Sequence, residues 1–210
     1  MKRDAARPSA DTEATTRQRI LDVALELFAQ HGFAGTSMRL LARTAGLRES
    51  SLYNHFSGKD DLYQAVIELW GPAEFVERLQ SAEYKKLAKD PEAFLRLCAK
   101  HLVDRWMDPR EHLFSAMINK EGPGGSGFQR YYKALFEDEL DLLEAYFVAF
   151  KKHCGMVAPN PRETARMLTA GFVHIRRELF ALPPGQLPAR AAVQKAMRRY
   201  LDNFIATVLP

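Results

Sequence analysis

Residues 36–62 read TSMRLLARTAGLRESSLYNHFSGKDDL, and this stretch decides the fold of the N-terminal part of the chain. A short helix is predicted to begin at Thr36 or Ser37, either of which can cap it, and Gly46 ends it. A second short helix follows over about residues 49–56. Gly46 can adopt the positive φ of a sharp turn without steric cost. The stretch therefore predicts a helix-turn-helix, whose second helix can enter the major groove of DNA.

The predicted second helix has an apolar side and a polar side. Leu52 and Phe56 lie four residues apart and, with Leu47, are expected to face the core. The remaining side chains donate and accept hydrogen bonds with little bulk, which suits a DNA groove. These side chains belong to Arg48, Ser50, Ser51, Tyr53, Asn54 and His55. Lys59 lies in the first turn of the next helix, where it and the backbone N–H groups can bind a phosphate.

Helical periodicity continues on both sides of this stretch. Ile20, Val23, Ala24, Leu27 and Phe28 follow the spacing of one helical face, and Thr15 with Gln18 fits a capping box at its start. Prolines preceded by Asp or Asn mark further helix starts, and no alternating stretch is convincing as a strand. We therefore predict an all-α fold with roughly nine helices.

Composition excludes several classes of protein. The chain has 210 residues, a net charge of +4 and two cysteines. No apolar run approaches the length of a membrane-spanning helix, and the polar N-terminus lacks the apolar segment of a signal peptide. We expect a cytoplasmic protein that does not associate with membranes. No catalytic glycine loop, nucleophile elbow or metal-ligand spacing is present, so we predict neither an enzyme nor a cofactor or metal site.

The stretch Thr36–Leu62 resembles the DNA-binding segment of the tetracycline-repressor (TetR) family. The preceding residues Phe28–Phe33 also match, as does the run Leu52–Phe56 followed by Lys59. The resemblance covers about residues 15–70. It implies a transcriptional regulator, usually a repressor that binds a palindromic operator as a homodimer and is released by a small molecule. The alternative is an all-α ligand-binding or scaffold protein that no longer binds DNA.

The resemblance also implies positions of contact with double-stranded DNA. Positions that match residues contacting the DNA backbone are Tyr53, His55 and Lys59. Positions that can reach bases or phosphates are Arg39, Glu49, Ser50 and Ser51. Thr36 and Ser37 match the phosphate-facing start of the first helix of the pair. Glu49 has two interpretations that stay open: it can accept a hydrogen bond from a cytosine amine, or it can cap the recognition helix.

The resemblance further implies a division of the chain. Residues 1–14 would form a flexible arm, residues 15–60 the helix-turn-helix domain, and residues 61–210 a ligand-binding and dimerisation domain. Candidate residues for a ligand pocket are Cys98, His101, Trp106, Phe114, Met117, Tyr131, Phe147 and His174. Each of them also fits ordinary core packing. The effector itself stays unidentified.

The last two predicted helices are the natural dimer interface. Two copies of a short recognition helix, related by a two-fold axis, double the contacts with DNA and select a palindrome. Candidate interface residues at helical spacing are Leu168, Gly171, Phe172, Ile175, Met197, Leu201 and Phe204. His174, Arg176 and Arg177 interrupt the apolar pattern. They can bind an anionic ligand, reach solvent, or pair across the dimer with the acidic run over residues 137–144.

Overall fold

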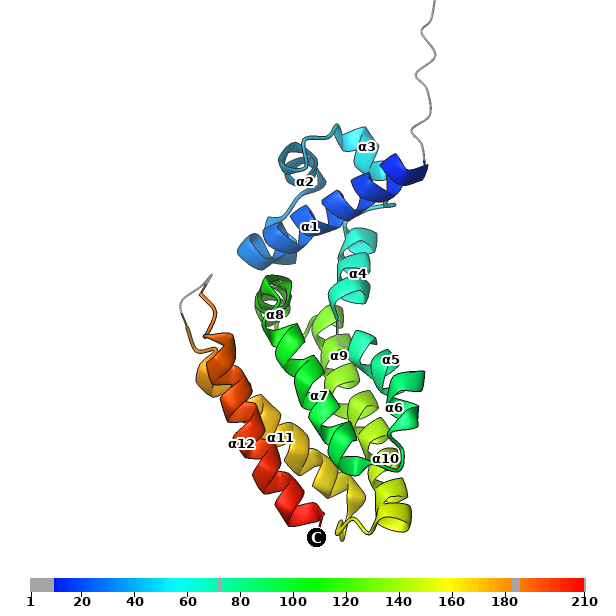
Figure 1. Cartoon of the computed structure of the whole chain (residues 1–210). Helices are drawn as coiled ribbons and strands as arrows, with labels where there is room; N and C mark the ends of the chain where they lie inside the picture. The colour runs from blue at the N-terminus through cyan, green and yellow to red at the C-terminus, as the bar shows by residue number, and fades with distance from the viewer. Residues whose placement is uncertain (1–9, 72, 183–185, 210) are drawn as a thin grey trace, which may run out of the picture. The chain divides into compact units, whose positions relative to one another are not determined.

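The computed structural model describes residues 10–71, 73–182 and 186–209, and every regular element among them is helical (Figure 1). The elements in chain order are α1 (Ala10–Gly35), α2 (Met38–Thr44), α3 (Glu49–Tyr53), α4 (Lys59–Trp70), α5 (Ala73–Leu79), α6 (Ala82–Lys86), α7 (Pro91–Trp106), α8 (Pro109–Glu121), α9 (Ser126–Lys133), η1 (Ala134–Asp138), α10 (Glu139–Cys154), α11 (Pro161–Leu179) and α12 (Arg190–Val208). The predicted all-α fold class is confirmed.

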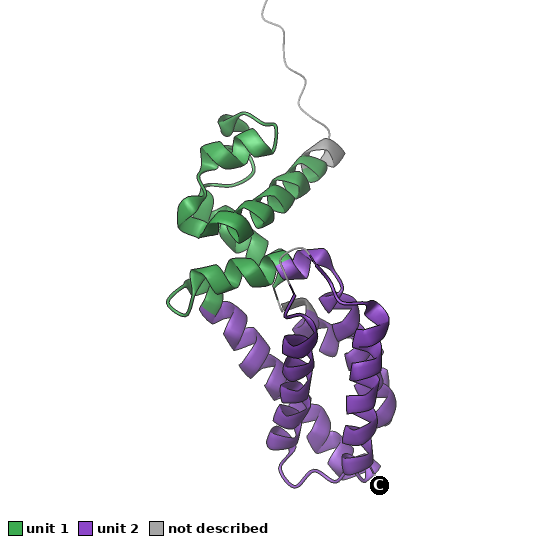
Figure 2. Cartoon of the chain, turned by 90° about the vertical axis from the view of Figure 1, so that its left-hand side faces the viewer, with its two compact units in different colours: residues 1–71, 113–128 green, residues 72–112, 129–210 purple. Residues whose placement is uncertain are grey.

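The chain divides into two compact units (Figure 2). The first contains residues 1–71 and 113–128, and the second contains residues 72–112 and 129–210. Helix α4, which packs against α1, belongs to the first unit. Helix α8 begins in the second unit and ends in the first. The compact units therefore differ from a division with a single boundary after residue 60.

The first helix begins earlier than the sequence pattern indicates. Helix α1 begins at Ala10, so the capping box predicted at Thr15 does not mark its start. Alanine and glutamate favour helix at the N-terminal end of this segment, and the helix extends through them. The predicted arm over residues 1–14 is therefore helical from Ala10 onward. Its residues 1–9 lie outside the described residues.

Apolar side chains of α1 form the core of the first unit. Ile20 and Phe28 are fully buried and lie on one helical face. Leu41, Leu52 and Leu62, from α2, α3 and α4, are equally buried. Each such side chain contributes about 1.5–3 kcal/mol by leaving water. This core fixes the positions of two helices as short as α2 and α3, which could not persist alone.

Asp61 binds the residue before the N-cap of helix α4, in place of the capping box that the sequence pattern predicts. The sequence pattern pairs Ser57 with Asp60. In the structure Asp61 Oδ2 accepts hydrogen bonds from Ser57 N at 2.8 Å and from Ser57 Oγ at 3.1 Å. Helix α4 starts at Lys59, and this shift by one residue brings Asp61 back over the start of the helix.

Helices α7, α10, α11 and α12 are the long helices of the second unit and run alongside one another in Figure 1. Phe94, Phe147, Leu168 and Val193, one from each helix, have no exposed surface. They belong to a continuous apolar core. No helix within the described ranges is long and apolar enough to cross a membrane.

One helix of the second unit has a wider turn. The helix predicted over about residues 127–153 is present as three consecutive segments, α9, η1 and α10. The middle segment η1 is π-helical. A π-helical turn takes up an extra residue and is often found at functional sites. It immediately precedes Glu139, the first residue of α10.

Candidate nucleic-acid interface and ligand pocket

The turn between α2 and α3 has the geometry that the sequence predicts. Gly46 has a φ of 66°, in the left-handed region that favours glycine. The N–H of Leu47 donates to Ala42 O at 2.9 Å, and the N–H of Gly46 donates to Arg43 O at 3.2 Å. These two bonds close the C-terminus of α2 as in a Schellman motif. At its start, Ser37 Oγ accepts from the N–H of Leu40 at 3.2 Å.

Helix α3 separates its apolar and polar side chains as predicted. Leu52 and Phe56 are buried, at 0% and 2% exposure, while Tyr53 is 52% exposed. The other candidate residues that are exposed are Ser37, Arg39, Arg48, Glu49, Ser50 and Asn54. Ser51 and His55 are half-buried. The α2–α3 pair therefore presents hydroxyl, amide, imidazole and guanidinium groups above a closed apolar core.

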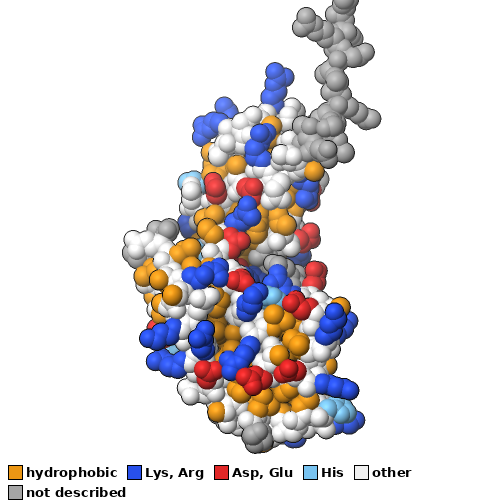
Figure 3. All heavy atoms as spheres, in the orientation of Figure 1, with side chains coloured by type: hydrophobic (Ala, Val, Ile, Leu, Met, Phe, Trp, Pro, Cys, Tyr) orange, Lys and Arg blue, Asp and Glu red, His pale blue; other side chains and the backbone are white. Residues whose placement is uncertain are grey.

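Three arginines on this surface have no counter-ion among the described residues. Arg39, Arg43 and Arg48 are exposed, and none has an ion-pair partner among the residues that the structure describes. Figure 3 shows Lys and Arg side chains gathered at the end of the first unit that carries α2 and α3. Arg43 was not among the sequence candidates. Its signal is the four-residue spacing from Arg39, which places both side chains on one face of α2.

Two candidate residues instead use their polar groups within the unit. Thr36 is 1% exposed, and its hydroxyl is bonded to Gly32 O at 2.8 Å and Leu27 O at 3.3 Å. This corrects its predicted phosphate contact, because the end of α1 encloses the side chain. Lys59 Nζ donates to Phe33 O at 2.9 Å and lies 4.2 Å from the centroid of the Phe33 ring. An ammonium group has three donors, so Lys59 keeps capacity for a further acceptor.

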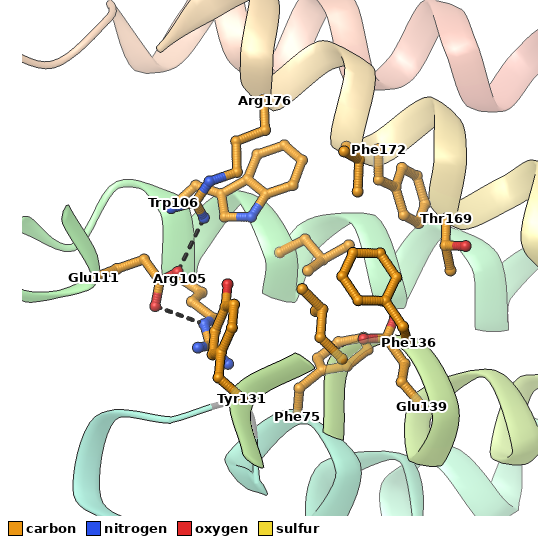
Figure 4. A pocket seen from close by; sticks show the side chains of 13 residues that line it. Phe75, Arg105, Trp106, Glu111, Tyr131, Phe136, Glu139, Thr169, Phe172 and Arg176 are labelled. Carbon is orange, nitrogen blue, oxygen red and sulfur yellow. Dashed lines mark hydrogen bonds and ion pairs between the residues drawn. The ribbon is translucent and has the colours of Figure 1, made fainter. Parts of the chain in front are cut away.

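The second unit contains a pocket with an aromatic wall (Figure 4). Its lining comes from α5, α7, α8, α9, η1, α10 and α11. The lining residues are Phe75, Leu102, Arg105, Trp106, Glu111, Tyr131, Leu135, Phe136, Glu139, Thr169, Phe172, Val173 and Arg176. Of the eight predicted ligand residues, Trp106 and Tyr131 line this pocket.

The other six predicted ligand residues lie elsewhere. Cys98, His101 and Phe147 are buried in the core of the second unit, where Tyr84 Oη and His101 Nδ1 share a hydrogen bond of 2.9 Å. Phe114 and Met117 are buried in the first unit. His174 is exposed on α11. All six have side chains of the types that line ligand pockets. Each of them, however, lies on a part of its helix that does not face this pocket.

A buried ion-paired group closes one side of the pocket. Glu111 is 5% exposed and accepts from Arg105 Nε at 2.9 Å and from an Arg176 guanidinium nitrogen at 3.0 Å. Arg176 also lies 5.8 Å from the centroid of the Trp106 ring. Arg176 therefore pairs within its own chain, whereas Arg177 is exposed. Sequence analysis missed Arg105 and Glu111, because neither interrupts an otherwise apolar run.

The acidic run also has partners within the chain. Arg162 donates to both Asp141 and Glu144 at 2.7 Å, and Lys133 pairs with Asp138 at 2.6 Å. Asp138, Asp141 and Glu144 therefore have partners within the chain, whereas pairing with Arg176 and Arg177 across a dimer was one of the alternatives left open by the sequence. Exposed pairs of this kind contribute little to stability, about 0–1 kcal/mol each.

Glu139 is the exception among these acids. It is 5% exposed, lines the pocket, and has no hydrogen-bond or ion-pair partner in the described part of the chain. Burial raises the pKa of Glu139 to about 8, and the charge of Arg105 only partly opposes this. In Figure 4 Glu139 lies beside Phe136 and Phe75, across the view from Glu111. A signal existed in the sequence: Glu139 is spaced four residues from both Leu135 and Leu143.

The predicted dimer residues form the core of a single chain. Leu168, Phe172, Ile175, Met197, Leu201 and Phe204 are all at most 6% exposed. Gly171 allows α12 to approach α11: a Cβ atom at this position would lie 2.1 Å from Tyr200 Cζ. Tyr200 Oη donates to Met167 O at 2.7 Å. These residues therefore join α11 to α12 and present little surface to a partner.

No group of three His, Cys, Asp or Glu residues within the described ranges could hold a metal ion. The polar groups of the first unit suit hydrogen bonding and phosphate binding. The pocket of the second unit suits a ligand with an apolar body, because aromatic side chains dominate its lining.

Curated relatives match the N-terminal part of this chain. The HTH-type transcriptional regulator AcrR of Shigella flexneri is 36% identical over 100 residues, which are 47% of this chain and 45% of that protein. The regulator SrpR of Pseudomonas putida is 42% identical over 62 residues, 30% of this chain and 29% of that protein. The match thus spans less than half of the length of these relatives.

Solved structures match nearly the whole chain in fold. NalD of Pseudomonas aeruginosa, the secondary repressor of the MexAB-OprM multidrug efflux pump, is 20% identical with a TM-score of 0.68, over 94% of this chain and 98% of that one. SmeT, the repressor of the Stenotrophomonas maltophilia multidrug efflux pump SmeDEF, is 20% identical with a TM-score of 0.67, over 92% and 90%. Residues 20–66 match the family described as bacterial regulatory proteins, tetR family. Residues 20–66 therefore match a TetR-family DNA-binding segment in sequence, and nearly the whole chain has the same fold as these solved repressors.

Proposed function

We propose that this protein is a cytoplasmic transcriptional repressor that binds a palindromic operator as a homodimer and is released by a small molecule. The observation that carries the proposal is the polar face of α2 and α3, in which Arg39, Arg43 and Arg48 have no counter-ion within the described part of the chain. Such cations gain most where they displace counter-ions from DNA phosphates. Helix α3 and its C-cap also expose Ser50, Tyr53 and Asn54, which supply donors and acceptors for base edges.

The homodimer is proposed on the outward faces of α11 and α12. The residues first assigned to the interface are buried within one chain, so other side chains must make it. Met167 on α11 is 59% exposed, which is unusual for a large apolar side chain in an otherwise well-buried helix. A Met167→Glu variant should dissociate to monomers in sedimentation equilibrium, while the control Lys89→Glu, at an exposed position outside α11 and α12, stays dimeric. If this variant and its control were both monomeric, or both dimeric, the interface would have to be assigned to another surface.

Release is proposed to be a shift between two populated states, with α8 as the connecting element. The first turn of α8 carries Glu111, which lines the pocket and pairs with Arg105 and Arg176. Its last residue is Glu121, which accepts from Tyr63 Oη of α4 at 2.8 Å. A ligand that alters the ion pairs of Glu111 would act on the same helix that contacts α4. Tyr63→Phe should then bind DNA normally and respond more weakly to ligand.

The experiment that tests DNA binding is selection from random duplexes with the purified protein. We expect enrichment of one palindrome and a steep loss of affinity as salt concentration rises. Tyr53→Ala should weaken binding by about tenfold or more while leaving the dimer intact, since one good base or phosphate contact is worth about 1–3 kcal/mol.

The matched control is Tyr132→Ala, because Tyr132 is 40% exposed but lies in the second unit. It should bind the selected duplex as the unmodified protein does. Absence of enrichment at low salt from a folded dimer would contradict DNA binding. A ligand-binding or scaffold protein would then be the better description.

A further inference from the structure

We propose that the pocket of the second unit binds a compact aromatic ligand with one positively charged nitrogen, and that Glu139 is its counter-ion. This inference rests on the proposed function, because it names the chemical class of the molecule that releases the protein from DNA. Its experiment contains no DNA, so the two proposals can fail separately.

The pocket wall holds two arginines and two glutamates, and among the described residues only one of these glutamates pairs with an arginine. Arg105 and Arg176 both donate to the carboxylate of Glu111, so these two guanidinium groups already share an anion. Glu139 has no such partner among the described residues, although only 5% of its surface is exposed. A buried carboxyl group without a partner is costly, and a ligand that supplies the missing positive charge removes that cost.

Aromatic rings line the same pocket as the carboxyl group and suit the same ligand. Phe75, Phe136 and Phe172 line the pocket together with Glu139, and Figure 4 shows Phe136 and Phe75 beside Glu139. Ring faces attract cationic groups, and they also pack against an aromatic ligand body. Phe136 is 46% exposed, so this ring lies at the opening of the pocket.

The size of the cavity limits the ligand. Its volume is about 80 Å³, whereas a single water needs roughly 10–15 Å³ by the same kind of measure. The pocket therefore has room for one small ring and its substituent. The π-helical turn η1 helps to make this space, because Leu135 and Phe136 of η1 and Glu139 just after it all face the same cavity.

The test is calorimetric titration of the full chain with three probes of similar size. Phenyltrimethylammonium carries the charge, tert-butylbenzene is its neutral isostere, and benzoate carries the opposite charge. We expect the cation to bind at least about tenfold more tightly than the isostere, and benzoate to bind least. Equal binding of the cation and the isostere, or tighter binding of benzoate, would overturn the proposal.

The variant Glu139→Gln keeps the shape of the side chain and removes its charge. It should lose at least about tenfold in affinity for phenyltrimethylammonium and keep its affinity for tert-butylbenzene. The matched control Glu137→Gln removes an exposed acid two residues away and should change neither. Unchanged cation affinity in a folded Glu139→Gln protein also counts against the proposal.

A second measurement on the unmodified protein does not depend on the folding of a variant. The charged and titratable groups facing Glu139 are Arg105 on α7, Glu111 on α8, Tyr131 on α9 and Arg176 on α11. Both arginines form ion pairs with Glu111, and burial raises the pKa of Tyr131. Cation affinity should therefore rise about tenfold from pH 6.5 to pH 9, as Glu139 ionises. A flat profile, or one that tert-butylbenzene shares, would exclude Glu139 as the counter-ion.

Discussion

The α2–α3 surface and the pocket of the second unit are built in opposite ways. The surface takes all its polar groups from residues 36–59, and most of them are exposed on two short helices. The pocket takes its lining from seven elements between Phe75 and Arg176. In the first region, the α2–α3 surface, local helical spacing decides which groups are presented. In the second, the packing of distant helices decides it. The four variants below test this difference.

The largest effect is expected from Glu139→Gln in the pocket. Burial raises the pKa of Glu139 to about 8, so folding favours its protonated form. This contribution to stability is fully present below the unfolded pKa near 4.5 and is lost as the pH rises through 8. The unmodified protein should lose about 3 kcal/mol between pH 5 and pH 8 through this group. Glu139→Gln should lack that slope in urea unfolding followed at several pH values.

The control for this comparison is Glu137→Gln, whose carboxylate is exposed. Its unfolding free energy should depend on pH as that of the unmodified protein does. A Glu139→Gln protein with the same slope would show that the carboxyl group is not desolvated in the folded state.

Gly171→Ala should destabilise the second unit by about 2 kcal/mol, because an added methyl group must displace a packed ring. Its Cβ would lie 2.1 Å from Tyr200 Cζ, and movement of the ring would break the bond from Tyr200 Oη to Met167 O. Gly124→Ala is the control, since no atom lies within 4 Å of its added Cβ. Thermal unfolding distinguishes them, and equal midpoints would contradict close packing of α11 on α12.

Gly46→Ala tests the turn of the first region, where the cost is conformational and not steric. Nothing lies within 4 Å of the added Cβ, but its φ of 66° disfavours any side chain. We expect a loss of about 1–2 kcal/mol in urea unfolding. Gly58→Ala, at an extended φ and with equal space, should cost less, and Gly46→Asn should recover part of the loss. If Gly46→Ala and Gly58→Ala behaved alike, the turn would not need its left-handed residue.

The smallest effect is expected from Arg43→Ala, which leaves stability unchanged and acts on DNA binding alone. If Arg43 contacts one phosphate, the slope of log affinity against log salt should fall by about one unit. The loss should be similar for all DNA sequences. Arg110→Ala removes an exposed arginine from the second unit and is the control. An altered sequence preference in Arg43→Ala would instead assign this residue to base reading.

Much of the first region could be predicted because its contacts are close in sequence. The spacing of Leu52 and Phe56 and the glycine at position 46 indicated which side chains are buried and where the chain turns. Thr36 could not be predicted in this way. A threonine before a helix looks the same whether its hydroxyl faces DNA or, as in the structure, the carbonyl groups of Gly32 and Leu27.

The second region was predicted less well, because apolar spacing does not identify the partner of a helical face. Leu168 and Phe172 have the pattern of an interface, yet the partner of that face is another helix of the same chain. Only two of the eight predicted ligand residues line the pocket. Glu139 and Glu111 looked alike as surface acids, and their surroundings differ only after folding.

The sequence by itself determined the all-α class, the helix-turn-helix and the polar face of α3. These follow from helical period, glycine geometry and side-chain type, which act over a few residues. The tertiary structure decided which acids are paired, which one lines a cavity with no partner among the described residues, and which apolar faces are already covered. Those outcomes depend on the packing of helices that are distant in sequence, and burial then changes the electrostatic cost of the same carboxyl group.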